Sequence, residues 1–250
     1  MPALINTFLF IEPLAHYLEY GSRVLQQIVQ ANRQIGQIIT ELLGDQATPE
    51  AVKAELQRLE PIVFCGIGHG NVNVYSVECT NVLVTADSPE LALFKDKIVD
   101  LCSCLTAQQL GPAIMDAGAV AYTGYKEEFY FYIGDAAGTT RAVQSPFLAE
   151  FQFVASLLQG KPTGEARADQ MKKYDEEIAY WTTGPEKDHP DALELARILN
   201  INKSISVFLG ETGVTPSPIA RAAIPQQITV AIPFALSFAA TLYLAKVLYS

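Results

Sequence analysis

The sequence predicts an α/β protein in which a mostly parallel sheet lies between two layers of helices, with a hydrophobic helix at the C-terminus. Three observations predict it. Apolar runs of strand length alternate with helical patterns over most of the chain. Two of these runs, residues 62–67 and 98–103, are almost entirely apolar, as expected for strands that are buried on both faces. The C-terminal part contains a long stretch without charged side chains.

These patterns divide the chain into three parts. Residues 1–211 hold the alternating elements and form the predicted α/β domain. Residues 212–221 are rich in Gly, Pro, Thr and Ser and form a linker. Residues 222–250 form the predicted hydrophobic helix. A chain of 250 residues is long enough for one large domain with such an appendage.

The elements of the domain follow from periodicity and from end signals. Residues 14–30 repeat apolar side chains at helical spacing, and Thr48 and Pro49 suit the N-cap and first turn of a helix. The predicted order is a strand at 3–11, a helix at 14–30, a strand at 35–43, a helix at 49–59, a strand from 62 towards His69, a hairpin at 72–85, a helical stretch from 88, a strand at 98–103, a helix at 107–117, a strand at 119–124, helices at 147–158, 164–180 and 191–199, and a strand at 204–210.

Composition excludes one class of partner. Half of the residues are hydrophobic, only 18% are charged, and the mean hydropathy is +0.18. The net charge is -10 and the chain has no run of Lys and Arg. Because nucleic-acid phosphates need a basic surface, we expect no nucleic-acid partner.

The cysteines indicate a reducing compartment. Cys65, Cys79, Cys102 and Cys104 are too few for a disulfide scaffold in a chain of this length. A zinc site that combines His69 with three of them is an alternative. The usual two-residue spacer is missing, however, and Cys102 and Cys104 belong to a predicted strand region. We therefore expect neither a metal nor a cofactor.

The two ends of the chain differ in kind. Residues 1–11 lack the basic region of a signal peptide and fit a first strand better. Residues 222–245 hold no charge over 24 positions, which as a helix at about 1.5 Å per residue would exceed a hydrocarbon core of about 30 Å. Pro225 and Pro233 interrupt this segment, but membrane helices tolerate proline. We expect it to insert into a membrane and leave the domain in the cytoplasm. The alternative is a cytoplasmic protein in which the segment packs inside the fold or an oligomer.

One histidine and one cysteine stand out at predicted strand ends. His69 lies between Gly68 and Gly70, and Cys104 follows the next apolar strand. Ligand sites in open α/β sheets lie beyond the carboxyl ends of the strands. A thiol and an imidazole at that edge are the nucleophile and base of a cysteine hydrolase. A helix expected just after Cys104 would stabilise its thiolate, and the Gly70 N–H would help to bind an oxyanion.

Other interpretations of these residues remain open. Cys104 would also fit a buried structural position. Residues 66–70 resemble a phosphate loop, but such a loop needs a helix directly after it, and residues 71–75 look extended. His16 lies in a predicted amphipathic helix and His189 in a charged loop, where solvated or packing roles are more typical.

Three blocks resemble caspase-like cysteine peptidases, the group of caspases, gingipains, legumains, separases and CHAT domains. They are Gly68-His69-Gly70-Asn71, then residues 104–111, then residues 118–129, and residues 202–210 are similar to the closing strand of such domains. The closer resemblance is to small prokaryotic CHAT- or gingipain-like domains, and it covers about residues 3–210. It implies a three-layer caspase-like fold.

The resemblance also implies roles for individual residues. His69 would be the general base and Cys104 the nucleophile, with an acyl-enzyme intermediate. The backbone N–H groups of Gly70 and Cys104 would form the oxyanion hole. Asn71 would orient the loop, and Asn71 and Cys102 would line the substrate pocket. Relatives often carry an acidic or amide side chain two residues before the nucleophile, where Cys102 stands here. No preference for Arg or Lys is therefore implied, and a pseudoenzyme remains open.

Three functions compete at this point. The first is a cysteine endopeptidase that acts on a peptide or protein and is tethered to a membrane by its C-terminal helix. The second is a non-catalytic structural or membrane-assembly subunit, in which the tail packs in a membrane or an oligomer. The third is a hydrolase or acyltransferase of small molecules on a similar sheet.

Overall fold

A computed structural model describes residues 7–13, 18–59, 62–78, 81–133 and 140–216. The predicted C-terminal helix, part of the linker, His16 and Cys79 lie outside these ranges. Across the described ranges, no helix is both long enough and apolar enough to cross a bilayer.

The centre of the fold is a six-stranded, mostly parallel sheet, which confirms the predicted α/β class. Its strands in spatial order are β2 (Ile38–Leu43), β1 (Thr7–Glu12), β3 (Val63–Ile67), β7 (Ile98–Cys102), β8 (Ala121–Tyr125) and β9 (Ser206–Gly210). All neighbours are parallel except β8 and β9, which are antiparallel. The predicted hairpin belongs to a small antiparallel sheet of β4 (His69–Asn71), β5 (Val74–Ser76) and β6 (Val82–Thr85).

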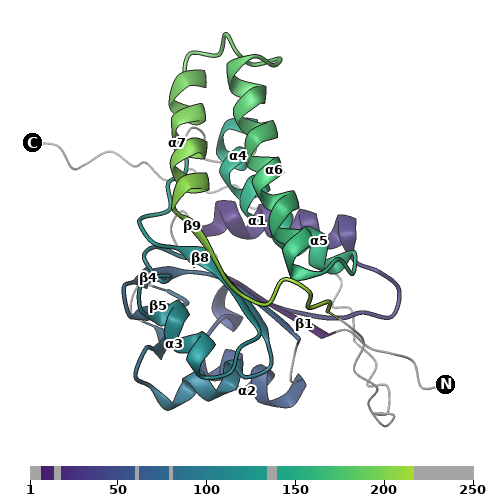
Figure 1. The fold of residues 1–250 in the computed structure, drawn as a ribbon, viewed down its shortest axis with the longest axis vertical. Helices are drawn as coiled ribbons and strands as arrows, with labels where there is room; N and C mark the ends of the chain where they lie inside the picture. Colours follow the sequence, from purple (N-terminus) through teal and green to yellow (C-terminus); the bar gives the residue numbers. More distant parts are fainter. Residues whose placement is uncertain (1–6, 14–17, 60–61, 79–80, 134–139, 217–250) are drawn as a thin grey trace, which may run out of the picture.

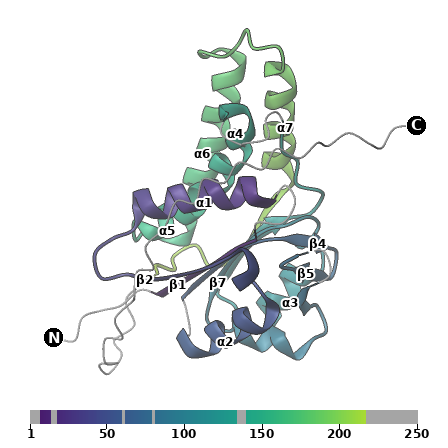
Figure 2. The same ribbon diagram turned by 180° about the vertical axis from the view of Figure 1, so that it is seen from behind.

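Helices cover both faces of the large sheet (Figures 1 and 2). One face packs against α1 (Leu18–Asn32), α4 (Arg141–Glu150) and α5 (Gln152–Leu158). The other face packs against α2 (Pro49–Leu59), α3 (Leu110–Asp116) and the small sheet, with short 3-10 turns η1 (Gly44–Gln46) and η2 (Pro89–Phe94) beside them. Helices α6 (Thr163–Thr182) and α7 (Ala192–Ile205) extend away from the sheet as a projecting pair (Figure 1).

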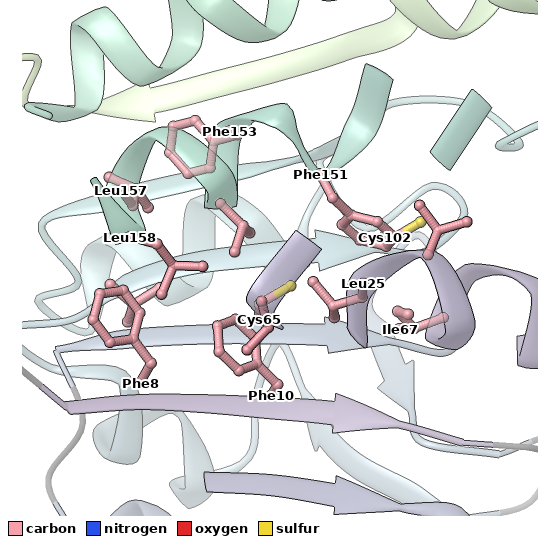
Figure 3. Close-up of a cluster of buried hydrophobic side chains, with 14 of the residues drawn as sticks. Phe8, Phe10, Leu25, Cys65, Ile67, Cys102, Phe151, Phe153, Leu157 and Leu158 are labelled. Carbon is pink, nitrogen blue, oxygen red and sulfur yellow. The ribbon is translucent and has the colours of Figure 1, made fainter. Parts of the chain in front are cut away.

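Alternation along the central strands produces two separate cores. In β7, Ile98 and Cys102 belong to the core under α1, α4 and α5, whereas Val99 and Leu101 belong to the core over α2 and α3. This is the two-residue period of a strand. Figure 3 shows the first core, in which Cys65 of β3 and Cys102 of β7 lie among the side chains of α1 and α5. Both central strands are buried at every position, as their apolar sequences predict.

The projecting pair has a core of its own. Tyr174 and Trp181 of α6 pack against Leu195 and Leu199 of α7. The Trp181 Nε1–H donates to Ser145 Oγ at 2.9 Å, which fixes the pair to α4. The first part of the linker also contacts α6, because the N–H groups of Thr163 and Gly164 donate to the carbonyls of Val214 and Thr212.

Several predicted bounds need correction. The helix predicted at 147–158 begins at Arg141, contains Pro146 and is broken at Phe151 into α4 and α5. Pro146 lies inside α4, where its missing N–H leaves out one hydrogen bond of the helix. Helix α7 continues to Ile205, well past the predicted end at 199. The stretch from 88 is a 3-10 turn.

Strand order identifies the edge where a ligand site is expected. From β1 the chain goes outwards to β2, then crosses back to β3 and continues to β7 and β8 on the other side. The strand order therefore reverses between β1 and β3. Open α/β sheets bind ligands beyond the carboxyl ends of the strands at such a reversal. His69 follows the carboxyl end of β3 after a single glycine.

Candidate active site

His69 is the first residue of β4, in the sharp change of direction after β3. It is partly exposed and pairs with Ser76 of β5. Gly68 is required at this bend, because a Cβ there would lie 2.3 Å from the carbonyl oxygen of Ser76 and 2.8 Å from the ring of Tyr75. The Tyr75 hydroxyl donates to the Ile67 carbonyl at 2.9 Å and holds the end of β3 in place.

Cys104 lies two residues beyond the end of β7, in a turn, and is partly exposed. The residue after it, Leu105, has a φ of 62°, in the left-handed region that a branched side chain rarely adopts. The strain is offset by backbone hydrogen bonds. The Leu105 N–H donates to Glu127 O at 3.0 Å, and the Ala107 N–H donates to Tyr125 O at 2.9 Å. Strained backbone of this kind is concentrated at functional sites.

The prediction of a helix just after Cys104 is wrong. Residues 105–109 form turns, and α3 begins only at Leu110. The thiol therefore does not lie at a helix N-terminus. The backbone of this segment forms hydrogen bonds with residues 125–127 instead. Periodicity cannot reveal this contact, because the two segments are distant in sequence. A different donor reaches the sulfur, since the Phe129 N–H lies 3.4 Å from Cys104 Sγ.

The two motifs are in direct backbone contact. The Gly68 N–H donates to the Cys102 carbonyl at 3.3 Å. A Cβ on Gly70 would lie 2.4 Å from the Cys104 carbonyl oxygen and 2.3 Å from Ser103 Oγ. Only glycine allows this approach. The residues that flank His69 on both sides therefore touch the segment that ends in Cys104, so the predicted pair belongs to one edge of the sheet.

Electrostatics keep the Cys104 thiol protonated. Burial raises the pKa of Cys104 above its ordinary value, the Phe129 N–H lowers it, and the negative charge of Glu128 raises it. A thiol with a raised pKa is a weak nucleophile at neutral pH. Chemistry at this sulfur needs a base that removes the proton during the attack, which is the role predicted for His69.

The remaining predicted site residues have different surroundings. The side chain of Asn71 is exposed and its Oδ1 accepts the Val72 N–H at 2.7 Å, so it shapes the β4–β5 turn. Cys102 is 4% exposed and lies in the first core. Burial raises the pKa values of Cys65 and Cys102 well above the ordinary value. Their contribution to a substrate pocket stays a prediction.

The described residues include no group of three or more His, Cys, Asp and Glu side chains that could hold a metal ion. Residues 71–74 continue into the β4–β5 hairpin, so no helix follows the glycines as a phosphate loop requires. His189 lines a different cavity of about 320 Å³ on the projecting pair, together with Tyr132, Arg141 and Trp181.

Sequence reasoning assigned no role to three carboxyl groups that the structure buries. Glu12 ends β1, Asp100 lies in β7, and Glu150 ends α4, all with side chains fully buried. The signal for Asp100 was present, because an acid inside an apolar strand is unusual. The signal for Glu150 was absent, since its neighbours in sequence predict nothing about its burial.

No protein-family model matches this sequence, and no curated protein matches it either. A functional conclusion therefore depends on the residues and their geometry.

Proposed function

We propose that this chain is a caspase-like cysteine endopeptidase that uses a His69–Cys104 dyad. The supporting observation is the backbone contact between Gly70 and Cys104 at the carboxyl edge of two neighbouring parallel strands, β3 and β7. A mostly parallel sheet between two layers is compatible with the caspase-like fold that the motifs imply.

In the proposed mechanism, His69 accepts the proton of Cys104 as Sγ attacks the carbonyl carbon of a peptide bond. The N–H groups of Gly70 and Cys104 stabilise the oxyanion. The C–N bond then breaks, and His69 passes its proton to the leaving nitrogen. Water hydrolyses the thioester, which releases the carboxylic acid and restores the thiol. The raised pKa of Cys104 fits a dyad in which the base acts during the attack.

A thiol-reactive peptide probe tests this proposal. We expect covalent labelling of the full chain, lost in Cys104→Ala and reduced at least tenfold in His69→Ala. His189→Ala is the matched control, because that histidine lines a separate cavity, and it should label normally. Labelling spread evenly over the four cysteines, or unchanged in His69→Ala, would contradict the dyad.

A non-catalytic structural or membrane-assembly subunit is the second candidate. Its support is the burial that raises the pKa of Cys104, and the uncharged Cys102 two residues before it, where relatives often carry an acidic or amide side chain. Absence of any probe-labelled species, together with a stable complex that survives Cys104→Ala, would favour this function.

We also propose that residues 222–245 tether the domain to a membrane with its catalytic part in the cytoplasm. The support is the length and lack of charge of this segment. The protein should stay with membranes after an alkaline carbonate wash, and a chain that stops at residue 216 should not. Release of the full chain by the wash would favour packing inside the fold or an oligomer.

A further inference from the structure

Two carboxyl groups are fully buried between the large sheet and the helices above it. Asp100 comes from β7, four residues before Cys104, and Glu150 is the last residue of α4. Neither belongs to the proposed dyad. Buried carboxylates are costly unless several donors or a cation compensate them, so their partners decide their charge.

Glu150 is held by donors on one oxygen only. The Tyr125 hydroxyl and the Gln170 Nε2–H both donate to Oε2, the latter at 2.9 Å. The Tyr125 hydroxyl also lies 2.7 Å from that of Tyr174. Within the described residues, Glu150 Oε1 is buried without a hydrogen-bond partner.

Asp100 has the same one-sided arrangement. The Cys65 Sγ–H donates to Oδ2 at 3.2 Å, whereas Oδ1 has no partner among the described residues. Thr123 stands opposite Asp100 on β8, and its Oγ1 is also buried without a partner in the described part of the chain. Unpaired oxygens therefore gather between β7, β8 and α4.

Within the described part of the chain, one cation acts on both carboxyl groups, the Arg167 guanidinium of α6. Its hydrogen bonds go to Gln170 Oε1 and to Ser206. The other titratable groups that face the pair are thiols and phenols: Cys65, Cys102, Tyr75, Tyr122, Tyr125 and Tyr174. One cation cannot neutralise two carboxylates.

We propose that Asp100 and Glu150 form a buried site that binds up to two protons and joins the helices to the sheet. A proton on a carboxyl group removes the charge and turns an unpaired acceptor into a donor. Protons are therefore the ligand that this arrangement fits, because Asp100 Oδ1 and Glu150 Oε1 are acceptors without donors among the described residues.

The pKa directions agree with this arrangement. Burial raises the pKa of Glu150 from 4.5 to about 7. Burial, followed by the charge of Glu150, raises the pKa of Asp100 well above its ordinary value. The site should therefore release its first proton near neutral pH and keep the second.

The proton site is connected to the proposed nucleophile. The Tyr125 ring lies 4.8 Å from the Phe129 ring, and the Phe129 N–H donates to Cys104 Sγ at 3.4 Å. Loss of the first proton places a charge on the acceptor of the Tyr125 hydroxyl, and the ring of that tyrosine packs on Phe129, whose N–H reaches the sulfur. This effect on reactivity rests on the proposed function, whereas the proton site itself does not.

The test compares the pH dependence of unfolding in the full chain and in Glu150→Gln. A carboxyl group with a raised native pKa stabilises the fold in acid, and that stability is lost as pH rises through the native pKa. Glutamine keeps the shape and the acceptor but binds no proton. Between pH 5 and 7 the folding constant of the wild type should fall about fortyfold relative to that of Glu150→Gln. Glu50→Gln, which changes an exposed residue in the first turn of α2, is the matched control. Its folding constant should depend on pH in the same way as that of the wild type.

A second variant and a second measurement keep the test decisive. Asp100→Asn, made in the Glu12→Gln background, should remove an infrared band of a protonated carboxyl group that Glu12→Gln alone keeps at pH 8. Parallel wild-type and Glu150→Gln slopes, or an unchanged band in Asp100→Asn, would overturn the proposal. Stabilisation of the wild type by a metal cation, lost in Glu150→Gln, would also overturn it in favour of a metal site. All variants are repeated in the Cys104→Ala background, so failure of the peptidase proposal leaves these outcomes readable.

Discussion

The two faces of the large sheet are built by the same strands but treat polar groups differently. On the face towards α2 and α3, the hydroxyls of Tyr75 and Tyr122 each have a partner at 2.9 Å. On the opposite face, Glu12, Asp100 and Glu150 keep buried oxygens that lack partners among the described residues. A hydroxyl can be satisfied by one acceptor, but a carboxylate only accepts and needs several donors. The first face should therefore be insensitive to pH and the second sensitive.

The largest effect should come from the apolar face. Phe64 is fully buried, with its ring edge-to-face against Phe94 at 5.3 Å. Phe64→Ala should lower the free energy of unfolding by about 3–5 kcal/mol, because the truncation leaves a cavity in a packed core. Chemical denaturation should give the same loss at pH 5 and pH 8. Val82→Ala, at a position 47% exposed, is the control. A stability loss that grew with pH would contradict the claim that this face is insensitive to pH.

Glu12→Gln should make the other face less sensitive to pH. Burial, and next the charge of Glu41, raise the pKa of Glu12 from 4.5 to about 8. Because the native state binds this proton more tightly, wild-type stability should fall as pH rises from about 4.5 to about 8. Between pH 5 and 7 the variant should gain about 2–3 kcal/mol relative to the wild type. Denaturation series at several pH values measure this gain, and a constant difference would contradict it.

Gly70→Ala tests the contact between the two site motifs. The new Cβ meets Ser103 Oγ and the Cys104 carbonyl, and that backbone cannot move aside easily. We expect a stability loss of about 1–3 kcal/mol and labelling of Cys104 reduced at least tenfold. Gly213→Ala, with no atom within 4 Å of its Cβ, should change neither quantity. Normal labelling in Gly70→Ala would mean that the reactivity of Cys104 does not depend on the close contact between Gly70 and the Cys104 carbonyl.

The smallest effect should come from Tyr75→Phe. The change removes the hydrogen bond to the Ile67 carbonyl, at the end of β3 just before Gly68 and His69. We expect a loss of about 1 kcal/mol, with no dependence on pH between 5 and 8. Tyr122→Phe, which loses the bond to Thr106, is the matched comparison on the same face. Unfolding measurements on both variants should agree within error, and a pH-dependent loss would contradict the assignment of this face.

Much of the fold could be predicted because its signals are local. The apolar runs of β3 and β7 were visible, since each strand is buried on both faces. The turn between β4 and β5 was missed, because residues 71–75 were expected to be extended. The start of α4 at Arg141 was missed, since the predicted helix began only at Phe147. The helix expected after Cys104 was wrong because residues 105–107 bond to residues 125–127.

The site was predicted in its positions but not in its surroundings. His69 and Cys104 could be identified because glycines and strand ends mark them in sequence. The Phe129 N–H near the sulfur could not, because it comes from a loop 25 residues away. The burial of Glu150 against Tyr125 and Gln170 was equally invisible, since those residues belong to other elements.

The sequence alone determined which segments are strands and which residues end them. It also indicated that an imidazole and a thiol each follow the carboxyl end of a strand. Tertiary structure decided that β3 and β7 are neighbours, that a turn rather than a helix follows Cys104, and that two carboxyl groups share one buried space. The physical reason is the distance along the chain over which each property is determined. Periodicity records the environment of each side chain, whereas charge and hydrogen bonding depend on partners that only folding brings into contact.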